Sequence, residues 1–240
     1  MTYEDYVSDI GFTSVQPTTP LGTGVLRLRG ALHRLGVDLD VAITRLPESG
    51  RRMRRTLREA CRVPRMSTFA IGAIINEAVA HMAPDHAFVN VGVWNGFTLL
   101  AGMAGNPDRR CIGVDNFSEF GGPRDAFLGR FVSARSERHE FHDMDYQAYF
   151  ARVHRGPIGF YIYDGEHSYA NQLRGLEVAA PFFAPGCILL VDDTNDEEPR
   201  RATLDFVAAQ GGAFRVLLDR RTACNGHPTF WNGVMLLQRV

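Results

Sequence analysis

Short apolar runs alternate with helix-like patterns from about residue 87 to the end of the chain. The alternation is typical of βαβ units and of a mostly parallel sheet. Only a turn-rich segment separates the last two runs, so these two are predicted to pair as an antiparallel hairpin. The pattern predicts an α/β fold with helices on both faces of a seven-stranded sheet. The predicted strands cover residues 87–93, 111–115, 139–143, 158–164, 188–193, 214–219 and 234–239.

The N-terminal part of the chain has a different pattern. Residues 26–46 and 50–66 read as helices rich in arginine. Such a pattern is compatible with solvated helix faces, or with a lid or oligomerisation element over the sheet. A further helix, capped by Ser67 or Thr68, then leads into the first strand of the sheet. We therefore expect an N-terminal helical extension over residues 1–66, a second domain over residues 67–240, and a homo-oligomer.

Composition narrows the choice of partners. The chain has 240 residues, 45% of them hydrophobic and 22% charged, with a formal net charge of -1. This excludes a disordered chain and lacks the basic excess of a general nucleic-acid binder. The four cysteines show no CxxC spacing, which argues against a zinc site, and no apolar run approaches the ~20 residues of a membrane span. We expect a cytoplasmic protein that binds small molecules, and neither nucleic acid nor a membrane.

A glycine loop follows the first predicted strand. Gly92 and Gly96 lie in the segment VGVWNGF, and the next strand ends at Asp115. Glycines at this place let the backbone approach a ligand, and an acidic residue after the second strand typically accepts hydrogen bonds from ribose hydroxyls. The tight turn GxGxxG, which binds a pyrophosphate, is missing. The loop therefore indicates a nucleoside without phosphates, although a simple strand-to-helix turn would also account for the glycines alone.

Carboxylates follow two further strands. Asp164 ends the run FYIYD, and Asp192 and Asp193 end the run ILLVDD. Neighbouring parallel strands bring their carboxyl ends together, so the three side chains are expected to converge and to need a cation. Oxygen ligands without a nearby cysteine favour Mg²⁺. Any one of these carboxylates alone would be read as a helix cap, but the trio favours a metal site.

An imidazole accompanies this predicted cluster. His167 follows Asp164 by three residues. An imidazole titrates near neutral pH and can accept the proton of an acceptor hydroxyl. A lone histidine is often structural, so a structural role and a role as general base both stay open for His167.

The glycine loop, Asp115 and the final hairpin together resemble the class I S-adenosylmethionine-dependent methyltransferases, which have a Rossmann-like sheet. The resemblance extends over about residues 67–240. It implies S-adenosylmethionine as cofactor and places Asp143 to Asp145 near the adenine. Where that family usually has an acidic residue two places before the first loop glycine, this chain has Asn90. The residues implied in cofactor binding are Asn90, Gly92, Asn95, Gly96, Asp115, Asn116, Asp143, Met144 and Asp164.

The segments DGEHSY and VDD resemble a narrower group, the macrolide-sugar and catechol O-methyltransferase-like enzymes. This resemblance implies that Asp164, Asp192 and Asp193 bind Mg²⁺ or another divalent cation. It also implies catalytic roles for Asp164 and for His167, which stands where the catechol enzymes carry a lysine that deprotonates the acceptor. The hypothesis is a methyl transfer to a hydroxyl of a sugar or phenol of a natural product.

Two other classes of protein are compatible with this kind of sheet. A nicotinamide-dependent oxidoreductase or a metal-dependent hydroxylase has the same kind of sheet, but the missing GxGxxG and the lack of a two-histidine, one-carboxylate set argue against them. A non-catalytic partner protein that only binds S-adenosylmethionine is disfavoured, because a pure binding module gains nothing from a costly cluster of charges.

Overall fold

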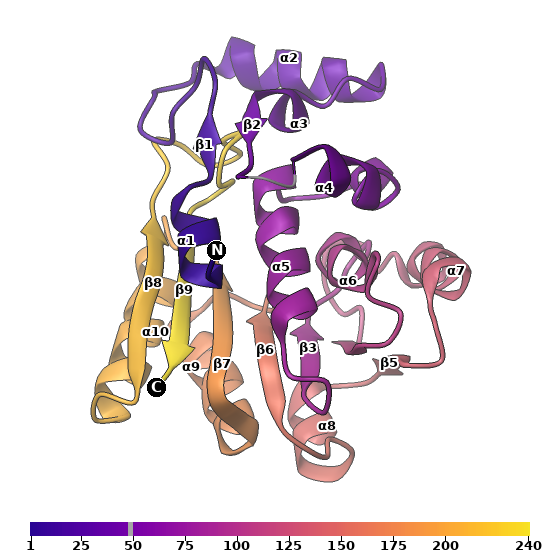
Figure 1. The fold of residues 1–240 in the computed structure, drawn as a ribbon, viewed down its shortest axis with the longest axis vertical. Coiled ribbons are helices and arrows are strands. Elements are labelled where there is room, and N and C mark those ends of the chain that lie inside the picture. Colours follow the sequence, from indigo (N-terminus) through magenta and orange to yellow (C-terminus); the bar gives the residue numbers. More distant parts are fainter. Residues whose placement is uncertain (48–49) are drawn as a thin grey trace.

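A twisted sheet of seven strands forms the centre of the computed structural model, which describes residues 1–47 and 50–240 (Figure 1). The strand order is β5-β4-β3-β6-β7-β9-β8. All neighbouring pairs from β5 to β7 are parallel, whereas β9 runs antiparallel to both β7 and β8. The strands are β3 (Ala87–Val91), β4 (Arg110–Asp115), β5 (His139–Asp143), β6 (Ile158–Tyr163), β7 (Phe183–Asp192), β8 (Phe214–Arg220) and β9 (Val234–Arg239).

The seven strands and the final hairpin confirm the fold predicted from the sequence. The boundaries agree to within two residues except at β7, which begins at Phe183 and not near residue 188. Another feature had no signal in the pattern: the last strand returns into the sheet between β7 and β8, so the penultimate strand becomes the edge. In this strand order, β9 pairs with the backbone N–H and C=O groups of β7 that would otherwise lie at the edge of the sheet without a partner.

Helices cover both faces of the sheet, as Figure 1 shows. Phe160 and Ile162 of β6 belong to the core on one face, whereas Tyr161 and Tyr163 belong to the core on the other. This alternation follows from the two-residue period of a strand, and burial on both faces explains why the strands read as continuous apolar runs. The sheet-covering helices are α5 (Phe69–His81), α6 (Phe97–Met103), α7 (Arg124–Ala134), α8 (Tyr146–Arg152), α9 (Tyr169–Ala179), with η2 (Ala180–Phe182) after it, and α10 (Glu197–Ala209).

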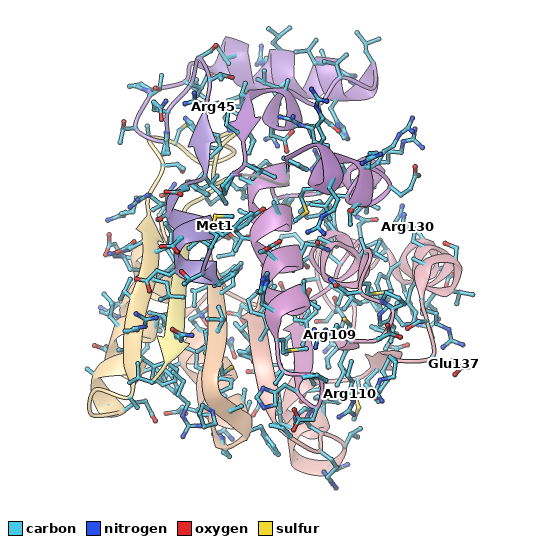
Figure 2. The ribbon with its side chains drawn as sticks, in the orientation of Figure 1. Met1, Arg45, Arg109, Arg110, Arg130 and Glu137 are labelled. Atoms are coloured by element: carbon cyan, nitrogen blue, oxygen red, sulfur yellow. The ribbon has the colours of Figure 1, made fainter. Side chains whose placement is uncertain are left out.

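Hydrogen bonds between side chains and the backbone hold helix α5 at both of its ends. Thr68 is its N-cap, and the Thr68 side chain accepts a hydrogen bond from the backbone N–H of Ile71 at 3.4 Å. At the other end, Arg109 donates to the backbone carbonyls of Ala80 and Met82 at 2.7 and 2.6 Å (Figure 2). The sequence-based choice of Ser67 or Thr68 as the cap is thus confirmed for Thr68.

The N-terminal elements lie at the end of the sheet to which the parallel strands point (Figure 1). Helix α1 reaches back to the sheet, where Glu4 pairs with Arg215 of β8 at 2.9 Å. Helix α2 contributes no buried residue. The boundary at residue 67 stays a prediction. The elements are α1 (Tyr3–Ser8), β1 (Gly11–Phe12), α2 (Thr23–Arg34), α3 (Leu39–Ile43), β2 (Thr44–Arg45), α4 (Gly50–Thr56) and η1 (Ala60–Arg62), and β1 pairs with β2.

A buried ion pair ties this N-terminal part to α5. Asp40 is 2% exposed, and its carboxylate accepts two hydrogen bonds from Arg65, at 3.2 and 3.1 Å. The same carboxylate accepts the backbone N–H of Phe69 at 2.7 Å. The Asp40 carboxylate therefore accepts hydrogen bonds both from a backbone N–H in the first turn of α5 and from the guanidinium of Arg65. In the described part of the chain, no helix is both long and apolar enough to cross a membrane.

Candidate active site

A cavity of about 250 Å³ opens at the carboxyl ends of β3, β4, β5 and β6. Ligands of open α/β sheets bind at this edge, since the loops that follow the strands converge there. Loops after all four strands contribute to its wall. The lining residues are Val91, Gly92, Trp94, Val114, Asp115, Asn116, Phe117, Ser118, Glu119, Phe120, Met144, Asp145, Tyr146, Gln147, Tyr163, Asp164, Gly165, Glu166 and Asn171.

Gly92 allows two walls of the cavity to touch. Its φ is +77°, which favours glycine, and a Cβ at this position would lie 1.9 Å from the carbonyl oxygen of Asp164. No side chain fits in that space. The loop after β3 and the loop after β6 therefore meet through bare backbone, and this contact closes one side of the cavity.

Asp115 organises the glycine loop. Its Oδ2 accepts the backbone N–H groups of Val93 and Trp94 at 2.8 and 2.9 Å, and its Oδ1 accepts that of Phe117 at 2.7 Å. A carboxylate oxygen has more than one acceptor site, so the side chain keeps capacity for a ligand hydroxyl. The residue that the sequence assigned to ribose thus also holds the loops on either side of it.

Five of the nine residues predicted to bind the cofactor line the cavity, namely Gly92, Asp115, Asn116, Met144 and Asp164. Asn90 does not line it. The side chain of Asn90 is fully buried, and its amide nitrogen donates to the carbonyls of Val91 and Gly92 at 3.2 and 2.9 Å. Asn90 therefore supports the glycine loop from beneath.

Three other predicted residues do not line the cavity either. The Oδ1 atom of Asn95 accepts a hydrogen bond from Arg130 of α7 at 2.8 Å (Figure 2). Gly96 lies against Phe127, whose ring would be 2.8 Å from a Cβ at that position. The third residue, Asp143, pairs with Arg124 at 2.6 Å. Sequence position placed these residues near the carboxyl ends of the strands, but the contacts that they make come from α7.

Aromatic side chains that were not predicted from the sequence form part of the wall. Trp94, Phe120, Tyr146 and Tyr163 all line the cavity. Phe120 is 68% exposed although it is large and apolar, and its φ is +50°. A large exposed apolar side chain on a strained backbone is a common sign of a binding site. The cluster of phenylalanine and glycine in NFSEFGG is the signal that could have pointed to this loop.

His167 lies between two of the carboxylates that were predicted to bind a metal, Asp164 and Asp193. Its Nε2 is 3.5 Å from Oδ1 of Asp164 and 3.5 Å from Oδ2 of Asp193. Asp192 is 5% exposed, and its Oδ1 accepts the backbone N–H of Asp193 at 2.9 Å. Asp193 has a φ of +56°, in the left-handed region that non-glycine residues rarely adopt. The structure thus brings Asp164, Asp193 and His167 together, beside the end of β7.

The charges of this cluster are coupled. Burial lowers the pKa of His167, but the hydrogen bond and charge of Asp164, with the charges of Asp193 and Asp192, outweigh it and raise the pKa from 6.5 to about 9. Burial raises the pKa of Asp192 well above its usual value, and the charges of Asp193 and Asp164 add to this. His167 is therefore protonated at neutral pH, and an imidazolium neutralises the converging carboxylates.

The predicted metal ligands Asp164, Asp192 and Asp193 belong to this arrangement. Within the residues that the structure describes, no group of three or more His, Cys, Asp or Glu side chains is arranged to hold a metal ion. The donors have the chemistry that a hard cation prefers. Their present geometry, however, suits the imidazolium, which occupies the space between Asp164 and Asp193.

Comparison with known families bears on this edge of the sheet. Residues 89–194 match the family model of a methyltransferase domain. The matched segment begins in β3 and ends just after β7, so it contains the glycine loop, Asp115 and the cluster around His167. The match supports a methyltransferase of the S-adenosylmethionine-dependent type. No curated protein matches the chain.

Solved structures share the fold at low identity. An O-methyltransferase from Bacillus cereus in complex with SAH has a TM-score of 0.56 and 12% identity, over 89% of this chain and 97% of that one. The O-methyltransferase NovP has a TM-score of 0.50 and 16% identity, over 70% of this chain and 79% of that one. An rRNA methylase from Streptococcus thermophilus has a TM-score of 0.51 and 13% identity, over 69% and 93%. These similarities establish the fold of the sheet domain.

Proposed function

We propose that the protein is an S-adenosylmethionine-dependent O-methyltransferase that acts on a hydroxyl of a small molecule, such as a sugar or a phenol. The observation that carries the proposal is the position of His167 between Asp164 and Asp193, in a segment matched by a methyltransferase domain. The B. cereus enzyme that shares the fold is in complex with SAH, the product of the same cofactor.

The cavity suits a nucleoside with an apolar and a polar end. Aromatic side chains, among them Tyr146 and Phe120, offer surfaces for a base, and Asp115 offers acceptor oxygens for ribose hydroxyls. Asp164 and Gly165 also line the wall, next to the position of His167. This arrangement would place the methyl group of the cofactor toward the carboxylate cluster.

His167 would take the proton during the reaction. His167 must first lose its own proton, so the base is present in a fraction of molecules that grows as the pH rises toward its raised pKa of about 9. The acceptor oxygen then attacks the methyl carbon, the carbon–sulfur bond breaks and a carbon–oxygen bond forms, while the acceptor proton passes to Nε2 of the neutral His167. The chain contains 26 arginines and no lysine. Arginines do not lose a proton in proteins, so no lysine or arginine side chain can act as the base in place of His167. Asp164 and Asp193 would orient the ring of His167 and stabilise it once protonated.

A first experiment tests cofactor and base separately. We expect titration calorimetry to detect binding of S-adenosylmethionine and SAH to the wild-type protein and to His167→Ala. Acceptors would be found by native mass spectrometry of co-purifying molecules and by a panel of sugars and phenols, with formation of SAH as the readout. His167→Ala is expected to lower kcat by about 10²–10⁴, the usual contribution of a positioned base. Full activity of this variant would remove His167 from the mechanism, and failure to bind either nucleoside would refute the cofactor.

Metal dependence is a separable part of the proposal. Asp164, Asp192 and Asp193 would hold Mg²⁺ or another divalent cation if the imidazole of His167 moved from between the carboxylates. A cation there would polarise the acceptor hydroxyl and lower its pKa. What supports this is the convergence of three carboxylates at neighbouring strand ends. We expect turnover to stop in excess chelator and to return with Mg²⁺, and full turnover in chelator would refute the metal while leaving the methyl transfer in place.

A further inference from the structure

A second cavity of about 730 Å³ lies between the N-terminal elements and the start of α5. It shares no lining residue with the cavity at the carboxyl edge of the sheet. Its wall combines apolar side chains with cationic ones. The lining residues are His33, Gly36, Val37, Asp38, Val41, Ala42, Arg54, Arg58, Cys61, Arg62 and Phe69.

Three arginines of this wall come from one continuous segment. Arg54 lies on α4, Arg58 in the turn that follows, and Arg62 in η1. Met53 and Leu57 of the same segment are buried at 2% and 0% exposure, so the segment is held against the core while the arginines lie on its outer side. The spacing of four residues places the arginines along one side of the segment.

The acidic groups near this wall already have other partners. Asp38 is 2.5 Å from Nδ1 of His33 and 3.3 Å from Arg65, and Asp40 is paired with Arg65. Among the described residues, neither Arg54 nor Arg58 forms an ion pair with an acidic side chain. The wall therefore keeps cationic charge that the described chain does not neutralise.

Arg54 and Arg62 differ in how firmly their side chains are held. Arg54 donates to the backbone carbonyl of Thr44 at 2.7 Å, which fixes its guanidinium at the rim. Arg62 pairs with Glu59 at 3.0 Å, but the two side chains are 61% and 76% exposed. Such an exposed pair is weak and can exchange for a better anion. Guanidinium groups bind phosphate and carboxylate oxygens through paired N–H donors.

We propose that this cavity binds a small molecule that carries a phosphate or carboxylate group on an apolar body. The anion would lie against Arg54, Arg58 and Arg62, and the apolar body against Val37, Val41 and Phe69. An extended polyanion such as RNA would instead use the whole exposed surface of α4, including Arg51, Arg52 and Arg55, which do not line the cavity. The apolar part of the wall, which a polyanion would not use, favours the small ligand. This site is independent of the methyl transfer proposed above.

The test uses phenyl phosphate, benzoate, inorganic phosphate and benzyl alcohol as probes, with binding measured by titration calorimetry on the full-length protein. Phenyl phosphate or benzoate is expected to bind with one-to-one stoichiometry and more tightly than inorganic phosphate or benzyl alcohol. The ratio of the dissociation constants of phenyl phosphate and benzoate shows which anionic group the site prefers. Saturation with SAH should leave this binding unchanged, because the two cavities share no lining residue.

Two double variants with the same change in charge separate the cavity from the general surface. Arg58→Gln with Arg62→Gln should weaken binding of the aromatic anion by about tenfold or more, since charge-assisted hydrogen bonds are lost. Arg51→Gln with Arg55→Gln should change it less than about twofold, because salt screens charges outside the cavity. Arg54 is left intact because it bonds to the backbone of β2. If the first pair lowers the melting temperature, Arg58→Gln alone replaces it.

Three results would overturn the proposal. The first is that none of the anionic probes binds the wild-type protein. The second is an equal loss in both double variants, together with tighter binding of an RNA oligonucleotide, which would identify the arginines as a surface for polyanions. The third is loss of phenyl phosphate and benzoate binding when SAH is present, which would place the probes in the cavity at the sheet edge.

Discussion

The contact between Gly92 and Asp164 offers a sharp test of how the active-site loops are held together. Replacing Gly92 by alanine would place a methyl group 1.9 Å from the carbonyl oxygen of Asp164 and 2.6 Å from its carbonyl carbon. Real Cβ contacts are hardly ever closer than 3.0 Å, so the two loops must separate by more than about 1 Å. Both loops line the cavity, and the change should therefore affect stability and cofactor binding together.

The expected loss of stability has three contributions. A non-glycine residue in the left-handed region costs roughly 1–2 kcal/mol, and forcing an extra methyl group into a packed contact costs roughly 1–3 kcal/mol. Replacing glycine also reduces the entropy of the unfolded chain, which returns about 0.4–1 kcal/mol. We expect Gly92→Ala to lower the free energy of unfolding by about 2–4 kcal/mol, a large part of the stability of a typical domain.

Gly186 provides a matched control. Its φ is +78°, close to the +77° of Gly92, but a Cβ at this position would meet nothing within 4 Å. In Gly186→Ala the alanine must adopt a left-handed backbone, but its methyl group meets no other atom. We therefore expect the free energy of unfolding to fall by at most about 1.5 kcal/mol. Urea unfolding followed by circular dichroism measures both variants, and calorimetry with SAH measures the cavity. Equal losses of stability in the two variants, with unchanged SAH affinity in Gly92→Ala, would refute the reasoning.

The remaining predictions concern single side chains. Asp115→Asn should weaken binding of S-adenosylmethionine by about 1.5–3 kcal/mol, because it removes a charged acceptor that holds three backbone N–H groups; unchanged affinity in calorimetry would show that Asp115 is misassigned. Asp40→Ala should lower the free energy of unfolding by about 2–4 kcal/mol, since it removes one of the two carboxylates that pair with buried Arg65 and leaves the backbone N–H of Phe69 without its acceptor, whereas Glu59→Ala, in an exposed pair, should change it little in the same urea titration. Burial lowers the pKa of His154 from 6.5 to about 4. Below about pH 6.5 the unfolded chain takes up a proton that folded His154 does not, so stability should fall by up to about 3 kcal/mol between pH 6.5 and 4. His154→Gln should make that fall shallower, and an identical pH dependence would contradict the assignment.

The sequence by itself determined the sheet and the place of the site. Strands buried on both faces must be apolar along their whole length, so runs such as residues 158–164 mark strands without any knowledge of their neighbours. Parallel strands end at one edge, so the residues that follow them, among them Gly92, Asp115 and Asp164, had to lie near one another. Local patterns also identified Thr68 as a possible helix cap, because capping depends only on nearby residues.

Only the tertiary structure decided where the side chains point and what surrounds them. Asn95 lies in the expected loop and Asp143 at the expected strand end, but their side chains pair with Arg130 and Arg124 of α7 and do not line the cavity. His167 lies between Asp164 and Asp193 because the loops after β6 and β7 approach each other, a distance that no spacing along the chain reveals. The same holds for the arginine-lined cavity: composition showed that residues 50–66 are basic, but α3 and α5 decide which arginines face a cavity. Local sequence patterns determine where each strand ends, whereas contacts between separate elements determine the environment of each charged side chain.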